Sequence, residues 1–198
     1  MCGICGFVGP GNQEDINRMV SALNHRGPDG RGSWNNGNSV YLGHSRLAII
    51  DIEYGHQPMV NQDQQVVISF NGEIYNHEDL RSELESAFVS IQWRGRSDTE
   101  VLLIALQCWG VEQTLAKLNG MFAFAFWDGK QKALFLARDR IGEKPLYFGR
   151  HNDVFLFGSE LKALVRHPLV RRSVDRVALA KYLAYEYIPA PRSIFEGV

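Results

Sequence analysis

Cys2 lies directly behind the initiator methionine and carries a thiol, a side chain that can act as a nucleophile. If Met1 is removed, the chain begins with a residue that has both a thiol and a free α-amine. A thiol becomes a good nucleophile when a base lies beside it, and an α-amine with a pKa of about 7.7–8.0 can serve near neutral pH. The position also suits a small apolar residue that opens a buried strand, because free cysteines are often buried and inert.

A cysteine acyl-transfer site also needs an oxyanion hole and polar groups that hold the substrate. Asn71-Gly72 follows an expected strand and could supply a side-chain amide and an unhindered backbone N–H, although an Asn-Gly turn is the alternative. Arg46 could clamp a carboxylate with two hydrogen bonds or form a structural ion pair. Asp98, at an expected helix start, could bind an ammonium group, or it could stabilise the helix by capping it and by its favourable interaction with the helix dipole.

The Cys2-x-x-Cys5 spacing could instead be a redox pair or half of a metal site. The sequence has no second CxxC and no HxxxH, and Cys108 lies in an apolar helical stretch. The histidines at positions 25, 44, 56 and 77 each fall in a different expected turn, without short ligand spacing. We therefore predict no metal site. The phosphate-binding pattern G-x-x-x-x-G-K-[ST] is also absent.

The composition is that of an ordinary globular protein, with 198 residues, 45% hydrophobic and 22% charged. A net charge of −1 gives no electrostatic reason to expect nucleic acid or an acidic membrane surface as a partner. No apolar run approaches the roughly 18 residues of a membrane span, and the N-terminus has no signal-peptide pattern. Three cysteines argue against a disulfide framework. We predict a cytoplasmic protein with neither nucleic acid nor membrane as partner.

Hydrophobic periodicity predicts strands and helices in an order that suits an antiparallel α+β fold and not a βαβ repeat. After an opening strand, we expect a helix over 14–23, a long surface loop over 24–37, apolar stretches within 40–51 and a strand over 65–70. Helices are expected over 78–88, 101–109 with a Ser97 cap, 113–118, 159–165 with a Ser159 cap, and 174–185. Further strands are expected over 121–127, 132–137, 145–148 and 154–157. Residues 188–198 contain two prolines and are predicted to link the domain of residues 1–187 to a further domain.

Taken together, the motifs closely resemble the N-terminal glutaminase domain of class II (N-terminal-nucleophile) glutamine amidotransferases, most of all that of the asparagine synthetase family. The carrying motifs run in order over nearly the whole chain: Met1-Cys2-Gly3-Ile4, His25-Arg26-Gly27-Pro28-Asp29, Gly43-His44-Ser45-Arg46-Leu47, Phe70-Asn71-Gly72-Glu73-Ile74-Tyr75-Asn76, Ser97-Asp98-Thr99-Glu100, Ala137-Arg138-Asp139-Arg140-Ile141-Gly142 and Lys144-Pro145-Leu146-Tyr147. The resemblance implies a four-layer αββα sandwich, the N-terminal nucleophile hydrolase fold.

The resemblance also implies a role for each candidate residue. Cys2 would be the nucleophile with its own amine as base, and Asn71 with the Gly72 N–H would form the oxyanion hole. The substrate L-glutamine would be held at its carboxylate by Arg46. Its amino end would be held by Glu73 and Asp98, helped by the backbone from Leu47 through Ile49 to Ile50. These assignments match charge to charge: a cation to the carboxylate, anions to the ammonium group and neutral donors to the oxyanion.

The function implied is hydrolysis of glutamine to glutamate and ammonia, with the ammonia passing to an ATP-dependent synthetase domain in cis that makes asparagine from aspartate. No cofactor is expected in this domain, whereas ATP and Mg are expected in the synthetase domain, and a homodimer is among the expected assemblies. The alternatives are a glutaminase domain with a different ammonia acceptor, or a non-catalytic or redox module on the same fold. Cys5 stands where the family usually has a small residue, so it is expected to serve packing, although a disulfide with Cys2 is conceivable.

Overall fold

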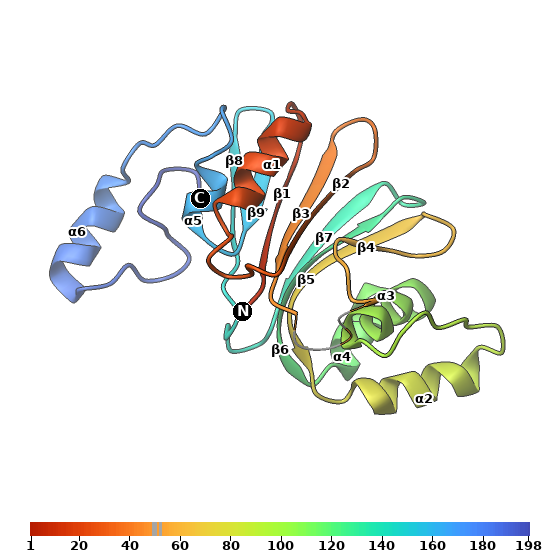
Figure 1. The fold of residues 1–198 in the computed structure, drawn as a ribbon. Helices are drawn as coiled ribbons and strands as arrows, with labels where there is room; N and C mark the ends of the chain where they lie inside the picture. The colour runs from red at the N-terminus through yellow and green to blue at the C-terminus, as the bar shows by residue number, and fades with distance from the viewer. Residues whose placement is uncertain (49–50, 52) are drawn as a thin grey trace.

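The computed structural model describes residues 1–48, 51 and 53–198, which form two antiparallel sheets with helices on their outer faces (Figure 1). The first sheet has five strands in the order β2-β3-β1-β9-β8. Their bounds are β1 Gly3–Val8, β2 Gly30–Asn35, β3 Val40–Arg46, β8 Tyr147–His151 and β9 Val154–Gly158. β1 is central, and it pairs with β3 from Gly3 opposite Ser45 to Val8 opposite Val40. The start of the chain is therefore held inside a sheet.

The second sheet has four strands in the order β4-β5-β6-β7. Their bounds are β4 Met59–Val60, β5 Val66–Ile74, β6 Gly120–Asp128 and β7 Ala133–Arg138. β5 and β6 pair along their whole length, and β6 is buried on both faces from Phe122 to Phe126, as expected for a strand that lies between two layers. The Asp128-Gly129 hairpin predicted from the sequence joins β6 to β7.

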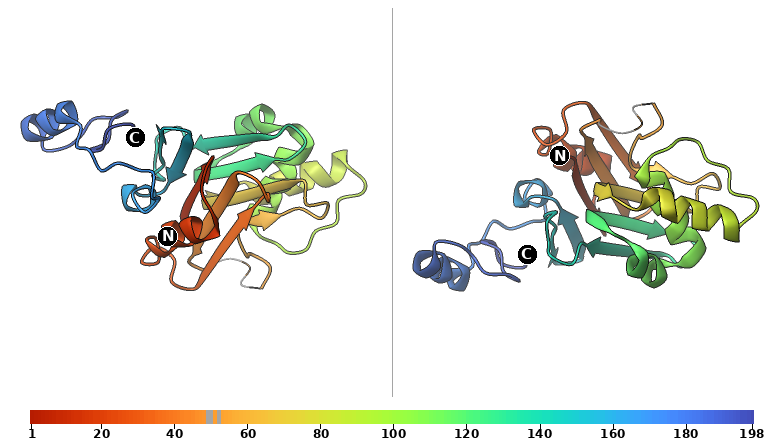
Figure 2. Two further views of the ribbon diagram at one scale, coloured as in Figure 1. Left: turned by 90° about the horizontal axis from the view of Figure 1, so that it is seen from above. Right: turned by 90° about the horizontal axis from the view of Figure 1, so that it is seen from below.

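Helices cover the outer face of each sheet, which gives four layers (Figures 1 and 2). On the first sheet lie α1 (Gln13–Ser21) and the short α5 (Leu161–Leu164); on the second lie α2 (His77–Ala87), α3 (Asp98–Trp109) and α4 (Val111–Lys117). Where the sheets face each other, an apolar cluster is buried that consists of Val40, Leu42, Val67, Ala125 and Phe157. The predicted α+β αββα sandwich is confirmed.

The last helix, α6 (Arg176–Tyr185), extends away from the sandwich (Figures 1 and 2). Ala178 is its buried residue, and several of its large apolar side chains are exposed. After α6 the chain turns back toward residues that precede the helix. Ile194 O accepts a hydrogen bond from Asp175 N, and Gly197 O accepts one from Arg150 N. The predicted boundary between residues 187 and 188 stays a prediction. None of the helices in the described residues is long and apolar enough to cross a membrane.

The predictions for residues 24–37 and for Ser159 were wrong. The stretch 24–37 was expected to be a loop, but β2 forms within it, pairing with β3 from Gly30 opposite Arg46 to Asn35 opposite Tyr41. The sequence of β2 consists mostly of glycines and polar residues, so it lacks the alternation of apolar residues that would predict a strand. Backbone pairing with β3 stabilises this edge strand instead. Ser159 was expected to cap a helix, but that helix begins after Glu160, and the Ser159 hydroxyl accepts a hydrogen bond from Ile4 N (3.0 Å).

Candidate active site

A pocket of about 170 Å³ lies where the two sheets and the start of α3 meet. Its lining comes from distant parts of the sequence: Met1, Cys2, Arg46, Leu47, Gly55, Gln57, Phe70, Asn71, Gly72, Glu73, Ser97, Asp98, Thr99, Met121 and Lys144. The first sheet supplies the residues just before β1 and the end of β3, and the second supplies β5 and β6. This is the pocket that brings the predicted site residues together.

Cys2 lies half-buried at the pocket, immediately before β1. Its Sγ donates to Leu47 O (3.6 Å) and accepts from Leu47 N (3.4 Å), so the thiol lies against the segment that follows β3. The peptide of Ile4 is fixed by Ser159, whose hydroxyl accepts from Ile4 N while Ser159 N donates to Ile4 O (2.8 Å). The backbone around the thiol is therefore held by its own strand neighbours.

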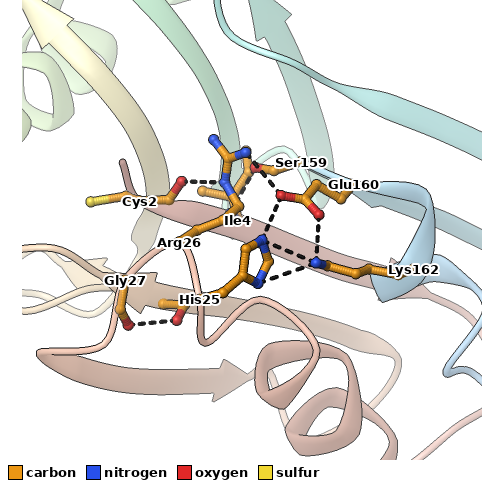
Figure 3. Close-up of polar contacts among 9 residues, drawn as sticks. Cys2, Ile4, His25, Arg26, Gly27, Ser159, Glu160 and Lys162 are labelled. Atoms are coloured by element: carbon orange, nitrogen blue, oxygen red, sulfur yellow. Dashed lines mark hydrogen bonds and ion pairs between the residues drawn. The ribbon is translucent and has the colours of Figure 1, made fainter.

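A cluster of charged side chains contacts the backbone of Cys2 (Figure 3). Arg26 Nε donates to the Cys2 carbonyl (2.8 Å), and Arg26 Nη1 pairs with Glu160 (3.0 Å). Glu160 also pairs with His25 (2.9 Å) and Lys162 (2.9 Å). Burial of Glu160 raises its pKa, but hydrogen bonds from Lys162, Arg26 and His25 outweigh this effect and lower the pKa to about 2. Glu160 therefore stays ionised and anchors the arginine that holds the Cys2 peptide.

Asn71 and Gly72 lie inside β5 and not in a turn after it, so the turn alternative is wrong. Asn71 is opposite Ala123 and Gly72 is opposite Phe122 of β6, and both Asn71 and Gly72 line the pocket. A Cβ on Gly72 would lie 2.2 Å from Met121 O, so the close β5–β6 pairing there requires glycine. The interior position explains why an Asn-Gly pair, usually a turn signal, forms regular strand.

The Asn71 side-chain amide is buried, and its Nδ2 has no hydrogen-bond partner among the residues that the structure describes. A buried amide donor without a partner costs about 1–3 kcal/mol, so native proteins rarely leave one without a reason. Because Asn71 lines the pocket beside Cys2, its Nδ2 and the Gly72 backbone N–H can act as donors to an oxygen atom bound there.

The charged residues at the other end of the pocket are of both signs. Arg46 is buried, and its Nη2 donates to Asp51 O (2.7 Å). Asp98 is also buried; its Oδ2 accepts from Ile74 N (3.0 Å) and its Oδ1 accepts from Thr99 N (2.8 Å). Burial raises the pKa of Asp98. The Glu73 side chain is exposed. The pocket can thus hold a small molecule that has both a carboxylate and an ammonium group.

The pocket includes seven of the predicted site residues: Cys2, Arg46, Leu47, Asn71, Gly72, Glu73 and Asp98. Ile49 and Ile50, predicted to contribute backbone groups, lie outside the described residues. Sequence reasoning missed Gln57 and Lys144. Gln57 Oε1 accepts from Phe70 N (2.7 Å), and its Nε2 donates to Thr99 Oγ1 (3.4 Å), which ties β5 to α3. No local pattern marks such long-range contacts.

His44 was assigned to a turn, which is wrong: it is a fully buried residue of β3. Its Nε2–H donates to Phe70 O (2.9 Å) and so joins the first sheet to the second. Burial lowers the pKa of His44 to about 4, which keeps the ring neutral at physiological pH. Its role is therefore to connect the two sheets that form the pocket.

Cys5 is fully buried among apolar side chains that include Ile16 and Met19 of α1, and burial raises the pKa of its thiol. All three cysteines are free. The expected packing role of Cys5 is confirmed. Its side chain is directed at α1, whereas Cys2 Sγ lies at the pocket beside Leu47, so the arrangement gives no support to a Cys2–Cys5 disulfide.

Comparison with known families identifies the class of protein to which this site belongs. The chain matches the family model described as a glutamine amidotransferase domain over residues 1–198. It therefore belongs to the glutamine amidotransferase family, and the resemblance seen in its motifs is confirmed. The match extends over both sheets and every residue of the pocket.

Among particular proteins, the chain is 42% identical over 206 residues to asparagine synthetase [glutamine-hydrolyzing] 3 of Bacillus subtilis, covering 100% of this chain and 33% of that protein. It is 36% identical over 220 residues to putative asparagine synthetase [glutamine-hydrolyzing] 2 of Methanocaldococcus jannaschii, covering 100% of this chain and 42% of the relative. The chain thus spans about a third to two fifths of the length of these relatives.

The fold is also similar to that of a solved glutamine phosphoribosylpyrophosphate amidotransferase from B. subtilis. The TM-score is 0.70 at 24% sequence identity, and the similarity covers 88% of this chain and 45% of the other. This similarity extends to the fold and supports the αββα architecture.

Proposed function

We propose that this domain hydrolyses the side-chain amide of L-glutamine, with Cys2 as the nucleophile, and supplies the ammonia to a synthetase domain. The observation that carries the proposal is the unpartnered Nδ2 of Asn71, buried in the same pocket as the Cys2 thiol. A buried donor held ready for a substrate oxygen is what acyl transfer requires. A packing cysteine or a redox module gives no reason for that orphaned amide.

The reaction begins once Met1 has been removed and Cys2 carries a free α-amine. The amine takes the thiol proton, and Sγ attacks the amide carbon of glutamine to form a tetrahedral oxyanion. Asn71 Nδ2 and the Gly72 N–H donate to that oxyanion. The C–N bond then breaks as the ammonium group of Cys2 returns its proton to the leaving nitrogen, which leaves as ammonia.

The product on the enzyme is a γ-glutamyl thioester on Cys2. A water molecule, deprotonated by the same amine, attacks the thioester carbon, and the C–S bond breaks to release glutamate and restore the thiol. Arg26 contributes by holding the Cys2 carbonyl, which fixes the direction of the amine and the thiol relative to the pocket. Precise orientation of this kind lowers the entropic part of the barrier.

Substrate selection follows from the charges at the far end of the pocket. Arg46 supplies a cation for the α-carboxylate, and Asp98 with Glu73 supplies negative charge for the α-ammonium group. The Asp98 carboxylate is fixed by two backbone N–H groups, so its position is set before substrate arrives. A free amino acid fits this pattern, whereas a glutamine inside a peptide has neither charge.

The length of the relatives supports a synthetase domain in cis. Both relatives carry asparagine synthetase in their names and are longer than this chain by a factor of more than two. We propose that this domain uses ATP and Mg²⁺ to activate aspartate, which accepts the ammonia, and that the full protein works in the cytoplasm, where a catalytic thiol stays reduced. A homodimer is part of this proposal.

The direct test is glutamate release by protein whose N-terminus has been checked by intact mass. Cys2→Ala should abolish release while leaving the melting temperature close to that of the parent, because the side chain is half-buried. A variant extended before Cys2, so that the α-amine is blocked, should lose most of its activity as well. Unchanged hydrolysis by Cys2→Ala would falsify the proposal, and Cys108→Ala is the matched control that should retain full activity.

A further inference from the structure

Lys144 is a buried cation at the pocket whose charge no described residue neutralises. It lies between β7 and β8, and its exposed fraction is 6%. Its Nζ donates to Met1 Sδ (3.6 Å), and no ion pair within 4.0 Å joins it to a carboxylate of the described residues. Burying a lysine ammonium group without a counter-charge costs free energy. An uncharged side chain would pack here at a lower cost, so packing alone does not explain why a lysine is present.

The backbone of Lys144 is held firmly in place. Its N–H donates to Asp139 Oδ2 (3.0 Å), and its carbonyl accepts from Arg138 Nε (2.5 Å). The Asp139 carboxylate also lies close to this backbone, but it accepts the backbone N–H groups of Phe122, Glu143 and Lys144. The Asp139 carboxylate therefore binds backbone N–H groups and forms no ion pair with Lys144, whose side chain is directed at the start of the chain.

We propose that Lys144 is a positioning residue that keeps the α-amine of Cys2 in its neutral form once Met1 has been removed. This inference rests on the proposed function, in which that amine is the base. The contact of Nζ with Met1 places a fixed positive charge at the residue joined to Cys2. Removal of Met1 exposes the new ammonium group to a like charge in a partly buried pocket, and like charges disfavour the protonated form.

The other charged groups near Cys2 do not cancel this effect. Arg26 adds positive charge at the Cys2 carbonyl, although Glu160 balances it, and Arg46 adds another cation at the pocket. On the negative side, Asp98 is fixed to the N–H groups of Ile74 and Thr99.

Two exposed carboxylates complete the surroundings. Glu73 lines the pocket, and Glu143 precedes Lys144 in the chain. Both side chains are exposed, so water screens their charges. Lys144 is thus a buried cation in contact with the start of the chain, and no carboxylate of the described residues forms an ion pair with it.

The test compares the pH profile of kcat/KM for glutamine hydrolysis in Lys144→Met, Lys144→Arg and the parent protein, all with Met1 removed. In Lys144→Met the acid limb should move up by about one pH unit, because a unit charge lining the same partly buried pocket is worth roughly that much at an effective dielectric constant of about 20. This corresponds to an activity loss of about fivefold at pH 7 and little loss above about pH 9. Lys144→Arg should keep the parent's limb.

Lys130→Met removes one lysine charge at an exposed position of the β6–β7 hairpin and is the matched control. It should leave the limb unchanged. A uniform loss at every pH in Lys144→Met would assign Lys144 a packing role, and an unmoved limb would show that its charge does not reach the amine. Either result overturns the inference.

A readout without catalysis separates this inference from the proposed function. In the Cys2→Ala background the N-terminal amine can be ¹³C-methylated and its pKa titrated by NMR, with and without Lys144→Met. A higher amine pKa in the double variant supports the inference, and an equal pKa refutes it. Failure of the proposed function would appear separately, as glutamate release that persists in Cys2→Ala.

Discussion

Replacing Asn71 by alanine should separate activity from stability. The amide of Asn71 is buried and its Nδ2 has no partner in the described part of the chain, so its removal relieves a desolvation cost of about 1–3 kcal/mol. The lost side chain lines a pocket, so water fills the space and no closed cavity forms. Because the relief offsets the lost packing, the melting temperature of Asn71→Ala should equal or exceed that of the parent by a few degrees.

The catalytic effect should be large and opposite. Loss of one oxyanion donor typically lowers kcat by about 10²–10³, which corresponds to about 2.7–4 kcal/mol. Since glutamine is held at its far end by other groups, the loss should fall on kcat and leave KM nearly unchanged. The assay is steady-state glutamate release, run beside thermal unfolding of the same samples.

Asn61 provides the matched control. It is also buried, but its Nδ2 donates to Gln107 Oε1 (3.1 Å), its Oδ1 accepts from Gln65 N (2.9 Å), and it lies outside the pocket lining. Asn61→Ala should lower the melting temperature by several degrees and leave kcat unchanged. The reasoning is refuted if Asn71→Ala loses as much stability as Asn61→Ala, or if its kcat stays within about threefold of the parent.

Two further predictions concern charge. Asp98→Asn should raise the KM for glutamine by about 10- to 100-fold with a smaller change in kcat, because the substrate ammonium group loses its buried partner. Steady-state kinetics measures both constants, and a large loss of kcat at saturating glutamine with an unchanged KM would contradict this prediction. For His44, the pKa is about 4 in the folded protein and higher in the unfolded chain, so the unfolded state binds more protons between these values. The free energy of unfolding should therefore fall as pH drops from about 6.5 to about 4, by roughly 3 kcal/mol. Urea titrations of the parent and His44→Gln should differ in this window, and equal slopes would contradict the assignment.

Much of the fold could be predicted because most elements have strong local signals. The alternating phenylalanines and alanines of β6, the Asp-Gly hairpin after it and the helical spacing in α1 each specify their element from nearby residues. Where the determinants are distant, the prediction failed. β2 exists because β3 pairs with it, and Ser159 serves a strand that is 155 residues away in sequence.

The site divides in the same way. Residues with distinctive chemistry in short motifs, such as Cys2 and Asn71, could be singled out, and the family resemblance placed them in one pocket. Gln57 and Lys144 could not be found, because their significance depends on backbone groups and a chain end brought close by folding. His44 was misplaced because a histidine among glycine and serine suggests a turn, whereas its burial depends on Phe70 of the other sheet.

The division of the pocket between two sheets has a consequence for how the protein matures. The thiol and Arg46 belong to one sheet, and the Asn71 amide belongs to the other, so neither sheet holds a working set by itself. Glutaminase activity can appear only after the sandwich has closed. Under the proposed function, a partly folded chain therefore cannot hydrolyse glutamine or release ammonia before both sheets are in place.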